Sequence, residues 1–202
     1  NDGSSPNHDE IFSEIETISN TVIIRHSSNL GKGAALKTAF KHYLSQKTLS
    51  CGIVTMDADG QHDCIDVQTL SENILDNSSP VYLGVRKFTR EIPWKSYIGN
   101  LLTSLIYRIL TASKLSDTQT GLRALPKLAV GRLLKIKCNH YDFELEMLLN
   151  LQKGGWQFFE IPIETIYINN NSESHFHSII DSAKVYFVFV KFFFNSTLPG
   201  IF

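Results

Sequence analysis

An apolar run that ends in two closely spaced aspartates is the feature that most constrains the fold of this chain. Residues 53–56 read Ile-Val-Thr-Met, and Asp57, Asp59 and Gly60 follow directly. This ending is typical of a buried parallel strand, which delivers carboxylates to its C-terminal edge, where open α/β sheets bind their ligands. Side chains at positions i and i+2 of an extended segment point the same way, so Asp57 and Asp59 can contact one ligand.

The natural ligand of such a carboxylate pair is a hard cation that prefers oxygen, Mg²⁺ or Mn²⁺. That cation would in turn hold the phosphates of a nucleotide. Asp-x-Asp-Gly is also ordinary turn chemistry after a strand, because Asp and Gly both suit turns. The motif alone is therefore compatible with both a metal site and a plain turn.

Composition bounds the class of protein. The 202 residues suffice for one domain, and a formal net charge of −1 gives no electrostatic reason to expect nucleic acid. Three cysteines without metal-site spacing indicate reduced thiols in a reducing compartment.

No window of about 18 uninterrupted apolar residues is present. The aromatic tail from Val185 onward, with Lys184 and Lys191, could lie at a membrane interface or pack against the domain.

Apolar spacing predicts an alternation of helices and strands. We expect helices over residues 9–19, 34–44, 66–75, 96–110, 127–134, 143–153 and from 181 onward. We expect strands over residues 21–25, 51–56, 81–85 and, as a pair or as one strand broken near Pro162, 156–168. The apolar side of the helix 96–110 would comprise Leu101, Leu102, Leu105, Ile106 and Ile109. The alternation predicts an α/β fold with a mostly parallel sheet flanked by helices.

Two motifs place basic side chains at the ends of predicted elements. Residues 29–35, Asn-Leu-Gly-Lys-Gly-Ala-Ala, open a helix, where glycines allow a ligand to approach closely and the helix N-terminus favours an anion. Lys32 adds a positive charge there. Arg86 ends a strand and could reach a diphosphate, since guanidinium suits phosphate geometry. Both motifs also have an explanation without a ligand. Residues 29–35 can be a plain glycine-rich start of a helix, and Arg86 can lie at a solvated basic edge.

Three polar segments follow in the second half of the chain. Residues 117–123, Asp-Thr-Gln-Thr-Gly-Leu-Arg, form either a sugar or acceptor site or a capped loop, because a buried polar run needs partners. Glu144 lies in the first turn of a helix, where it complements the helix dipole or contacts sugar hydroxyls. Ser174 and His175 lie in a polar loop and could touch phosphate when that loop closes.

Taken together and in this order, these motifs resemble glycosyltransferase family 2. The likeness is greatest to its polyprenyl-phosphate branch, which includes dolichyl-phosphate mannose synthases and the transferase domain of proteins that carry a GtrA-type membrane domain. The resemblance covers nearly the whole chain and implies a GT-A-type, Rossmann-like fold and a nucleotide-sugar donor. The matching segments are 1–5, 29–35, 57–62, 84–86, 117–123 and 174–176.

The resemblance also implies roles for individual residues. The metal, Mg²⁺ or Mn²⁺, would be held at Asp57, Asp59 and Gln61. The nucleotide-sugar side would comprise Asp2 near the base or ribose, Lys32, Asp57, Gln61 and Arg86. The sugar or acceptor side would comprise Gln119, Arg123, Glu144, Ser174 and His175. The catalytic group would comprise Asp59, Asp117 and Arg86.

The family pattern also predicts segments that this sequence lacks. Family members begin with two strands and a helix ahead of the Asn-Asp-Gly-Ser-Ser turn, which stands here at residues 1–5. We therefore expect residues 1–182 to be an N-terminally incomplete catalytic domain, lacking its first strands and poorly stable alone. Residues 183–202 would be an amphipathic aromatic tail that leads to a membrane domain.

The expected function is metal-dependent, inverting transfer of a hexose from a UDP- or GDP-sugar to undecaprenyl or dolichyl phosphate. The partners would be the nucleotide sugar, the polyprenyl phosphate and the cytoplasmic face of a membrane. A family 2 transferase with a polysaccharide or soluble acceptor is a second possibility. A nucleotide-sugar-binding fragment without catalysis and a nucleotidyltransferase are others.

Overall fold

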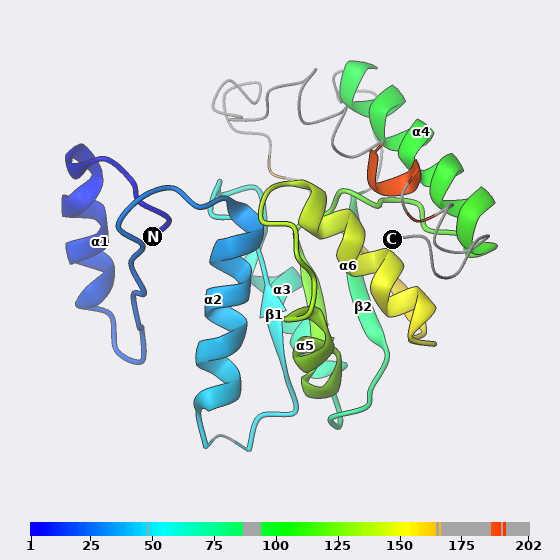
Figure 1. Ribbon diagram of the computed structural model, residues 1–202. Coiled ribbons are helices and arrows are strands. Elements are labelled where there is room, and N and C mark those ends of the chain that lie inside the picture. The colour runs from blue at the N-terminus through cyan, green and yellow to red at the C-terminus, as the bar shows by residue number, and fades with distance from the viewer. Residues whose placement is uncertain (48, 87–93, 165, 167–186, 191, 193–202) are drawn as a thin grey trace.

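A four-stranded sheet forms the centre of the molecule. The computed structural model describes residues 1–47, 49–86, 94–164, 166, 187–190 and 192 (Figure 1). The strands, in spatial order, are β1 (Gly52–Thr55), β3 (Arg123–Pro126), β2 (Val81–Arg86) and β4 (Phe158–Ile163). β2 pairs with β4 in parallel, whereas β3 pairs antiparallel with both β1 and β2. Three of these strands therefore run in one direction and β3 runs against them, in a mixed sheet.

Helices cover both faces of this sheet, which confirms the α/β class. The helices are α1 (Asp9–Glu16), α2 (Lys32–Ser45), α3 (Cys64–Glu72), α4 (Trp94–Thr111), α5 (Lys127–Leu133) and α6 (Asp142–Lys153), and a 3₁₀ turn, η1, spans Pro6–His8. α2, α5 and α6 contact one another on one face, and α3 packs on the opposite face (Figure 1). α1 lies to one side of this layered body (Figure 1).

Side-chain alternation along β3 divides the core into two layers. Leu125 packs with Phe40 of α2 and Phe143 of α6 in the larger cluster. Ala124, the neighbouring residue, points to the other face and packs with Leu70 of α3. Successive residues of a strand face opposite sides of the sheet, so a short strand suffices to connect both layers.

Two of the expected strands need correction. The β-branched run 21–25 forms no strand within the described residues; its neighbour His26 donates its backbone N–H to the Asn1 carbonyl, 2.9 Å away. The strand β3 was not predicted. It has only four residues, and its first and last residues, Arg123 and Pro126, are not typical of a strand. β4 continues through Pro162 without a break. Proline lacks a backbone donor, and β4 tolerates it because it is the last strand in the sheet order.

The predicted apolar side of α4 does not face the core. Leu101, Leu102, Leu105 and Ile109 are 42–71% exposed. The buried side of α4 instead carries Asn100, Thr103 and Tyr107, with Ile106 partly buried against the core. The helix itself is where the apolar spacing predicted it, and most of its apolar side faces outward.

The described part of the aromatic tail is helical at residues 187–190. Val188 and Phe189 are buried in the larger core cluster, whereas Phe187 and Val190 are exposed. Part of the tail therefore packs against the domain, as one of the two alternatives proposed. Within the described ranges, no helix combines the length and the hydropathy needed to cross a bilayer.

Candidate active site

A small polar pocket lies at the ends of β1 and β2. It has a volume of about 80 Å³ and is lined by Asp57, Asp59, Gln61, His62, Arg86, Gln119, Thr120 and Gly121. The structure thus brings together five of the predicted site residues from three separate motifs. A hollow of this size holds a few water-sized groups.

The two aspartates are held by the backbone around them. Asp57 lies two residues beyond the end of β1, and Thr55, the last residue of that strand, donates its hydroxyl to the Gly121 carbonyl, 3.0 Å away. A Cβ at Gly121 would overlap the Asp57 carboxylate, so the close approach requires glycine here. Asp59 accepts the backbone N–H of Gln61 at 3.0 Å, in a turn that includes Gly60 with a φ of 75°.

Lys32, the first residue of α2, bridges two acidic side chains. Its Nζ lies 2.6 Å from Oδ1 of Asp57 and 3.1 Å from Oε2 of Glu144. Burial alone would lower the pKa of Lys32, but the charges of Glu144 and Asp57 outweigh burial and raise that pKa. The ammonium therefore stays charged between β1 and α6. The sequence placed Lys32 at the pocket but gave no sign that Glu144 would pair with it.

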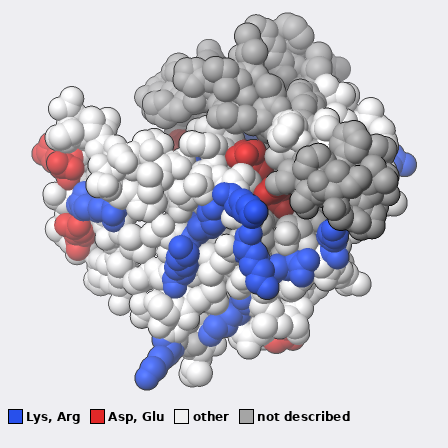
Figure 2. Space-filling view, in the orientation of Figure 1, with Lys and Arg blue, Asp and Glu red and all other residues white. Residues whose placement is uncertain are grey.

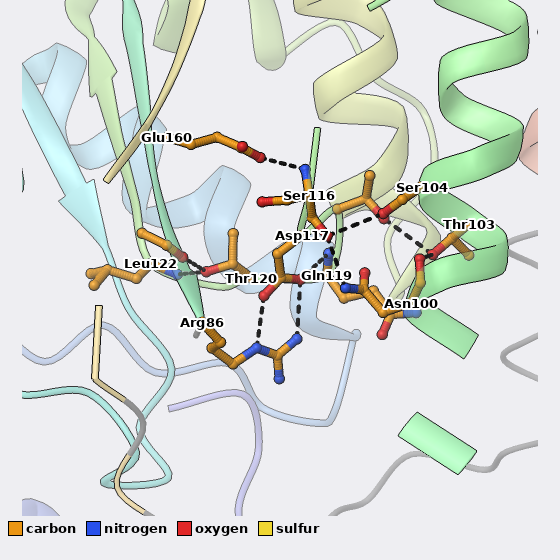
Figure 3. Close-up of polar contacts among 12 residues, drawn as sticks. Arg86, Asn100, Thr103, Ser104, Ser116, Asp117, Gln119, Thr120, Leu122 and Glu160 are labelled. Carbon is orange, nitrogen blue, oxygen red and sulfur yellow. Dashed lines mark hydrogen bonds and ion pairs between the residues drawn. The ribbon is translucent and has the colours of Figure 1, made fainter. Parts of the chain in front are cut away.

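Arg86 and Asp117 form a bidentate ion pair (Figure 3). Arg86 Nε donates to Oδ2 of Asp117 at 2.7 Å, and Nη2 donates to Oδ1 at 3.1 Å. Asp117 is fully buried and also accepts the backbone N–H of Gln119 at 3.0 Å. A carboxylate with both oxygens paired in this way suits the orientation of Arg86 better than proton abstraction.

The polar loop that carries Asp117 is fixed from several elements (Figure 3). On α4, Asn100 donates to the Ser116 carbonyl at 3.2 Å, and the hydroxyls of Thr103 and Thr118 lie 3.1 Å apart. Glu160 of β4 accepts the Ser116 backbone N–H. Sequence reasoning missed Asn100 and Thr103, although polar residues at helical spacing opposite an apolar side were a signal that could have found them.

Arg123 occupies a different place from the one expected. Its side chain is 1% exposed, and its Nε and Nη1 donate to the carbonyls of Thr120 and Glu144 at 2.8 and 2.9 Å. The guanidinium therefore ties the polar loop to the start of α6 from within the protein. Arg123 therefore supports the backbone next to the pocket but does not line the pocket itself.

Asp2, which is partly buried, is likewise engaged by other groups of the protein. Its carboxylate lies 2.6 Å from His26 Nδ1 and accepts the backbone N–H groups of Leu30 and Gly31 at 3.0 and 2.8 Å. His26 Nε2 in turn lies 2.9 Å from the Thr38 hydroxyl on α2. Asp2 thereby anchors the loop that presents Lys32.

The oxygen-rich lining of the pocket bears on the predicted metal. In the part of the chain that is described, no group of three or more His, Cys, Asp and Glu side chains is arranged to hold a metal ion. Asp57, Asp59 and Gln61 offer two carboxylates and an amide oxygen in one pocket. Mg²⁺ is commonly bound by one or two carboxylates together with substrate phosphates, so this donor set fits such an ion. Ser174 and His175 lie outside the described residues.

Charge is unevenly distributed over the surface. Lys and Arg side chains gather on the face formed by α2, α5 and α6, and acidic side chains adjoin them (Figure 2).

A larger open groove of about 420 Å³ lies elsewhere, lined by side chains that include Ser113, Gln152, Trp156 and Phe159. This groove has no charged residue in its lining, so the smaller polar pocket is the candidate active site.

Comparisons with known proteins agree with this geometry. Residues 1–124 match the family model of glycosyl transferase family 2. An uncharacterized protein of Methanocaldococcus jannaschii is 31% identical, over 87% of this chain and 73% of its own length. The UDP-N-acetylglucosamine–dolichyl-phosphate N-acetylglucosaminyltransferase of Methanococcus voltae is 32% identical, over 82% of this chain and 72% of its own.

A solved structure of another protein has a similar fold. Glucosyl-3-phosphoglycerate synthase of Mycobacterium tuberculosis, in complex with uridine diphosphate, aligns with a TM-score of 0.61. The alignment covers 94% of this chain and 66% of that one, at 12% sequence identity. At this identity the likeness concerns the fold alone.

Proposed function

The chain belongs to glycosyl transferase family 2, and on that premise we propose that it transfers a hexose from a nucleoside diphosphate sugar to a polyprenyl phosphate. It is a glycosyltransferase, and the relative from Methanococcus voltae supports the acceptor class through its named dolichyl-phosphate substrate. The observation that carries the proposal is the pocket that combines Asp57, Asp59 and Arg86 at the ends of β1 and β2. Carboxylates and a guanidinium together suit a metal-bound diphosphate.

The exposed apolar side of α4 supports a lipid acceptor. Leu101, Leu105 and Ile109 recur at a spacing of four residues and are exposed, while the opposite side of the helix holds the Asp117 loop. Apolar residues that gather on one exposed side mark contact with a partner or a membrane. A membrane-bound polyprenyl phosphate would then reach the enzyme beside its pocket. The three free cysteines agree with action at the cytoplasmic face.

The proposed metal is Mg²⁺ or Mn²⁺, held by Asp57 and Asp59 with Gln61 beside them. When bound, it would neutralise the charge that grows on the leaving diphosphate. Arg86 would add electrostatic stabilisation from a fixed position, because Asp117 holds its guanidinium in one plane. Lys32 would supply a second positive charge at the edge of the same site.

The acceptor phosphate needs little help from a base. A phosphate monoester has a second pKa of about 6, so it is largely ionised at neutral pH. The buried and paired Asp117 therefore fits a positioning role, and direct attack on the face opposite the diphosphate would invert the anomeric carbon. Gln119, which lines the pocket, is the residue we propose for contact with the sugar.

A product analysis tests the proposal. The protein is incubated with Mg²⁺ or Mn²⁺, undecaprenyl or dolichyl phosphate, and UDP- or GDP-sugars, and mass spectrometry searches for a glycosylated lipid phosphate. We expect one such lipid, and none with the Asp59→Ala variant. Transfer to an added oligosaccharide, with the lipid phosphates unchanged, would favour a family 2 transferase with a soluble acceptor. Nucleotide-sugar binding without any product would identify a binding module.

A further inference from the structure

Lys32 is the point at which the proposed metal site meets a second acidic group. Its ammonium lies between Asp57 and Glu144, whose side chains are 30% and 13% exposed, and it is itself 27% exposed. The two carboxylates come from distant parts of the chain, the end of β1 and the first turn of α6. The same Nζ lies 6.0 Å from the centre of the Tyr141 ring.

The backbone that carries Lys32 is fixed, so only its side chain is free to rearrange. Gly31, which precedes it, has a φ of 98° and donates its N–H to Asp2 at 2.8 Å. Ala34, two residues after Lys32, donates its N–H to the Asn139 carbonyl at 3.0 Å. The backbone of Glu144 is fixed in the same way, because its carbonyl accepts an N–H from Nη1 of the buried Arg123.

We infer that Lys32 and a divalent cation compete for Asp57, and that Glu144 keeps Lys32 in place when the cation binds. An ammonium 2.6 Å from one Asp57 oxygen occupies a position where a cation would bind, and the two positive charges repel each other. Glu144 offers the displaced ammonium an alternative partner already 3.1 Å away. From there Lys32 remains at the edge of the site, where it faces the diphosphate that arrives with the metal.

This inference rests on the proposed function, because it assumes a metal at Asp57. A simpler account gives Lys32 a purely structural role in tying α2 to β1 and α6. The two accounts differ in how Lys32 and Glu144 affect metal affinity. Under competition, removal of Lys32 strengthens metal binding, and removal of the Glu144 charge weakens it only while Lys32 is present.

The test measures Mn²⁺ affinity without nucleotide, by isothermal titration and by the loss of the free Mn²⁺ signal in electron paramagnetic resonance. The proteins are the wild type, Lys32→Met, Glu144→Gln, the double variant and Asp59→Ala. Lys41→Met is the matched control, since it removes an exposed lysine from the same helix, about 13 Å further along its axis. Thermal unfolding of each variant confirms that it is folded.

We expect Lys32→Met to bind Mn²⁺ at least about threefold more tightly and Glu144→Gln at least about threefold more weakly than the wild type. In the Lys32→Met background, Glu144→Gln should have no further effect, because its influence acts through Lys32. An equal loss from Glu144→Gln in both backgrounds would instead mean that Glu144 acts on the metal directly and would overturn the inference. Unchanged affinity in both single variants would support the structural account.

The proposed metal site itself has a separate readout. Mn²⁺ affinity that is lost in Asp59→Ala supports the site whatever the Lys32 and Glu144 variants do. Mn²⁺ affinity that is equal in the wild type and Asp59→Ala contradicts the metal site and the inference together. Mn²⁺ affinity that is absent from both overturns the inference alone, because the metal would then bind only together with the phosphates of the substrate.

Discussion

Gly121 lies so close to Asp57 that any side chain there would move the carboxylate. A Cβ would overlap atoms of the Asp57 carboxyl group. We therefore expect Gly121→Ala to destabilise the fold by about 1–3 kcal/mol through overpacking and to weaken metal-dependent nucleotide binding. Urea denaturation and isothermal titration with a nucleoside diphosphate and Mn²⁺ measure the two effects.

Gly131 on α5 provides the matched control for that prediction. A Cβ built at Gly131 meets nothing within 4 Å. Gly131→Ala should therefore leave nucleotide binding unchanged and stabilise the helix by about 0.5–1 kcal/mol. Equal behaviour of the two glycine variants would show that Gly121 does not set the position of Asp57.

Asp2 should make stability depend on acid pH. Burial by itself raises the pKa of the Asp2 carboxyl, but the hydrogen bonds from His26, Leu30 and Gly31 outweigh burial and lower that pKa below its ordinary value of 3.8. A lowered folded-state pKa gives stability that is fully present above 3.8 and is lost as the pH falls through the folded-state value. Asp2→Asn lacks this carboxyl.

The measurement compares the free energies of unfolding of the wild type and Asp2→Asn from about pH 5 downward. We expect the wild type to be more stable at pH 5, with the difference shrinking below pH 3.8 as Asp2 becomes protonated. A difference that stays constant over this range would mean that Asp2 gains no stability from its charge.

Individual pocket residues were predictable to the extent that local patterns reveal them. Asp57 and Asp59 follow one recognisable strand and Arg86 ends another, so the sequence indicated that they lie at one edge of the sheet. The contact of Lys32 with Glu144 joins residues that are far apart in the chain, and no local pattern reports it. For the same reason the inward position of Arg123 became visible only in the folded chain.

At the scale of elements, the ion pair between Arg86 of β2 and Asp117 of the polar loop after α4 should contribute to both stability and binding. Asp117→Asn removes the charge that pairs with Arg86 inside the protein. We expect a loss of about 3 kcal/mol in the free energy of unfolding, near the low end for a buried pair because Arg86 is 30% exposed and can still contact water.

The same variant also tests the role of Asp117 in the reaction. As a positioning residue, it should weaken nucleoside diphosphate binding when it is lost, because Arg86 is no longer held in place. As the base, it should leave that binding unchanged and remove the acidic limb from the pH profile of turnover. Isothermal titration and a pH–rate profile separate the two roles.

The exposed side of α4 should bind membranes. Leu105→Glu and Ile109→Glu place a charge on this side without disturbing the core, so stability should change by less than about 0.5 kcal/mol. We expect both variants to sediment less with phospholipid vesicles than the wild type. Leu128→Glu, which alters an exposed leucine on α5, is the control and should sediment normally. Equal sedimentation of all three variants and the wild type would remove α4 as the membrane-facing element.

Elements were predicted well where their periodicity was long and poorly where it was short. The helix of α4 follows from its spacing, but spacing alone does not say which side of a helix meets the core. In α4 the polar residues face inward, because Asn100 and Thr103 satisfy buried groups of the Asp117 loop. β3 was missed because four residues that begin with Arg123 and end with Pro126 show no alternation of apolar and polar side chains.

At the scale of the whole molecule, the sheet explains why distant motifs meet. β1 and β2 run in the same direction on either side of β3, so Asp57 and Arg86 emerge at the same edge. α2 and α6 begin beside that edge, and so Lys32 and Glu144 reach it as well. The class of fold followed from the alternation of helices and strands, whereas the antiparallel insertion of β3 did not, because strand order depends on contacts between distant segments.

The most direct test of the central claim, that this pocket holds a metal-bound diphosphate, is a calorimetric titration of uridine or guanosine diphosphate with and without Mn²⁺. We expect the wild type to bind one of these nucleotides more tightly with Mn²⁺ than without it, and Asp59→Ala to lose the Mn²⁺-dependent part of the affinity. Nucleotide binding that is the same with and without Mn²⁺, and the same in Asp59→Ala, would contradict the account.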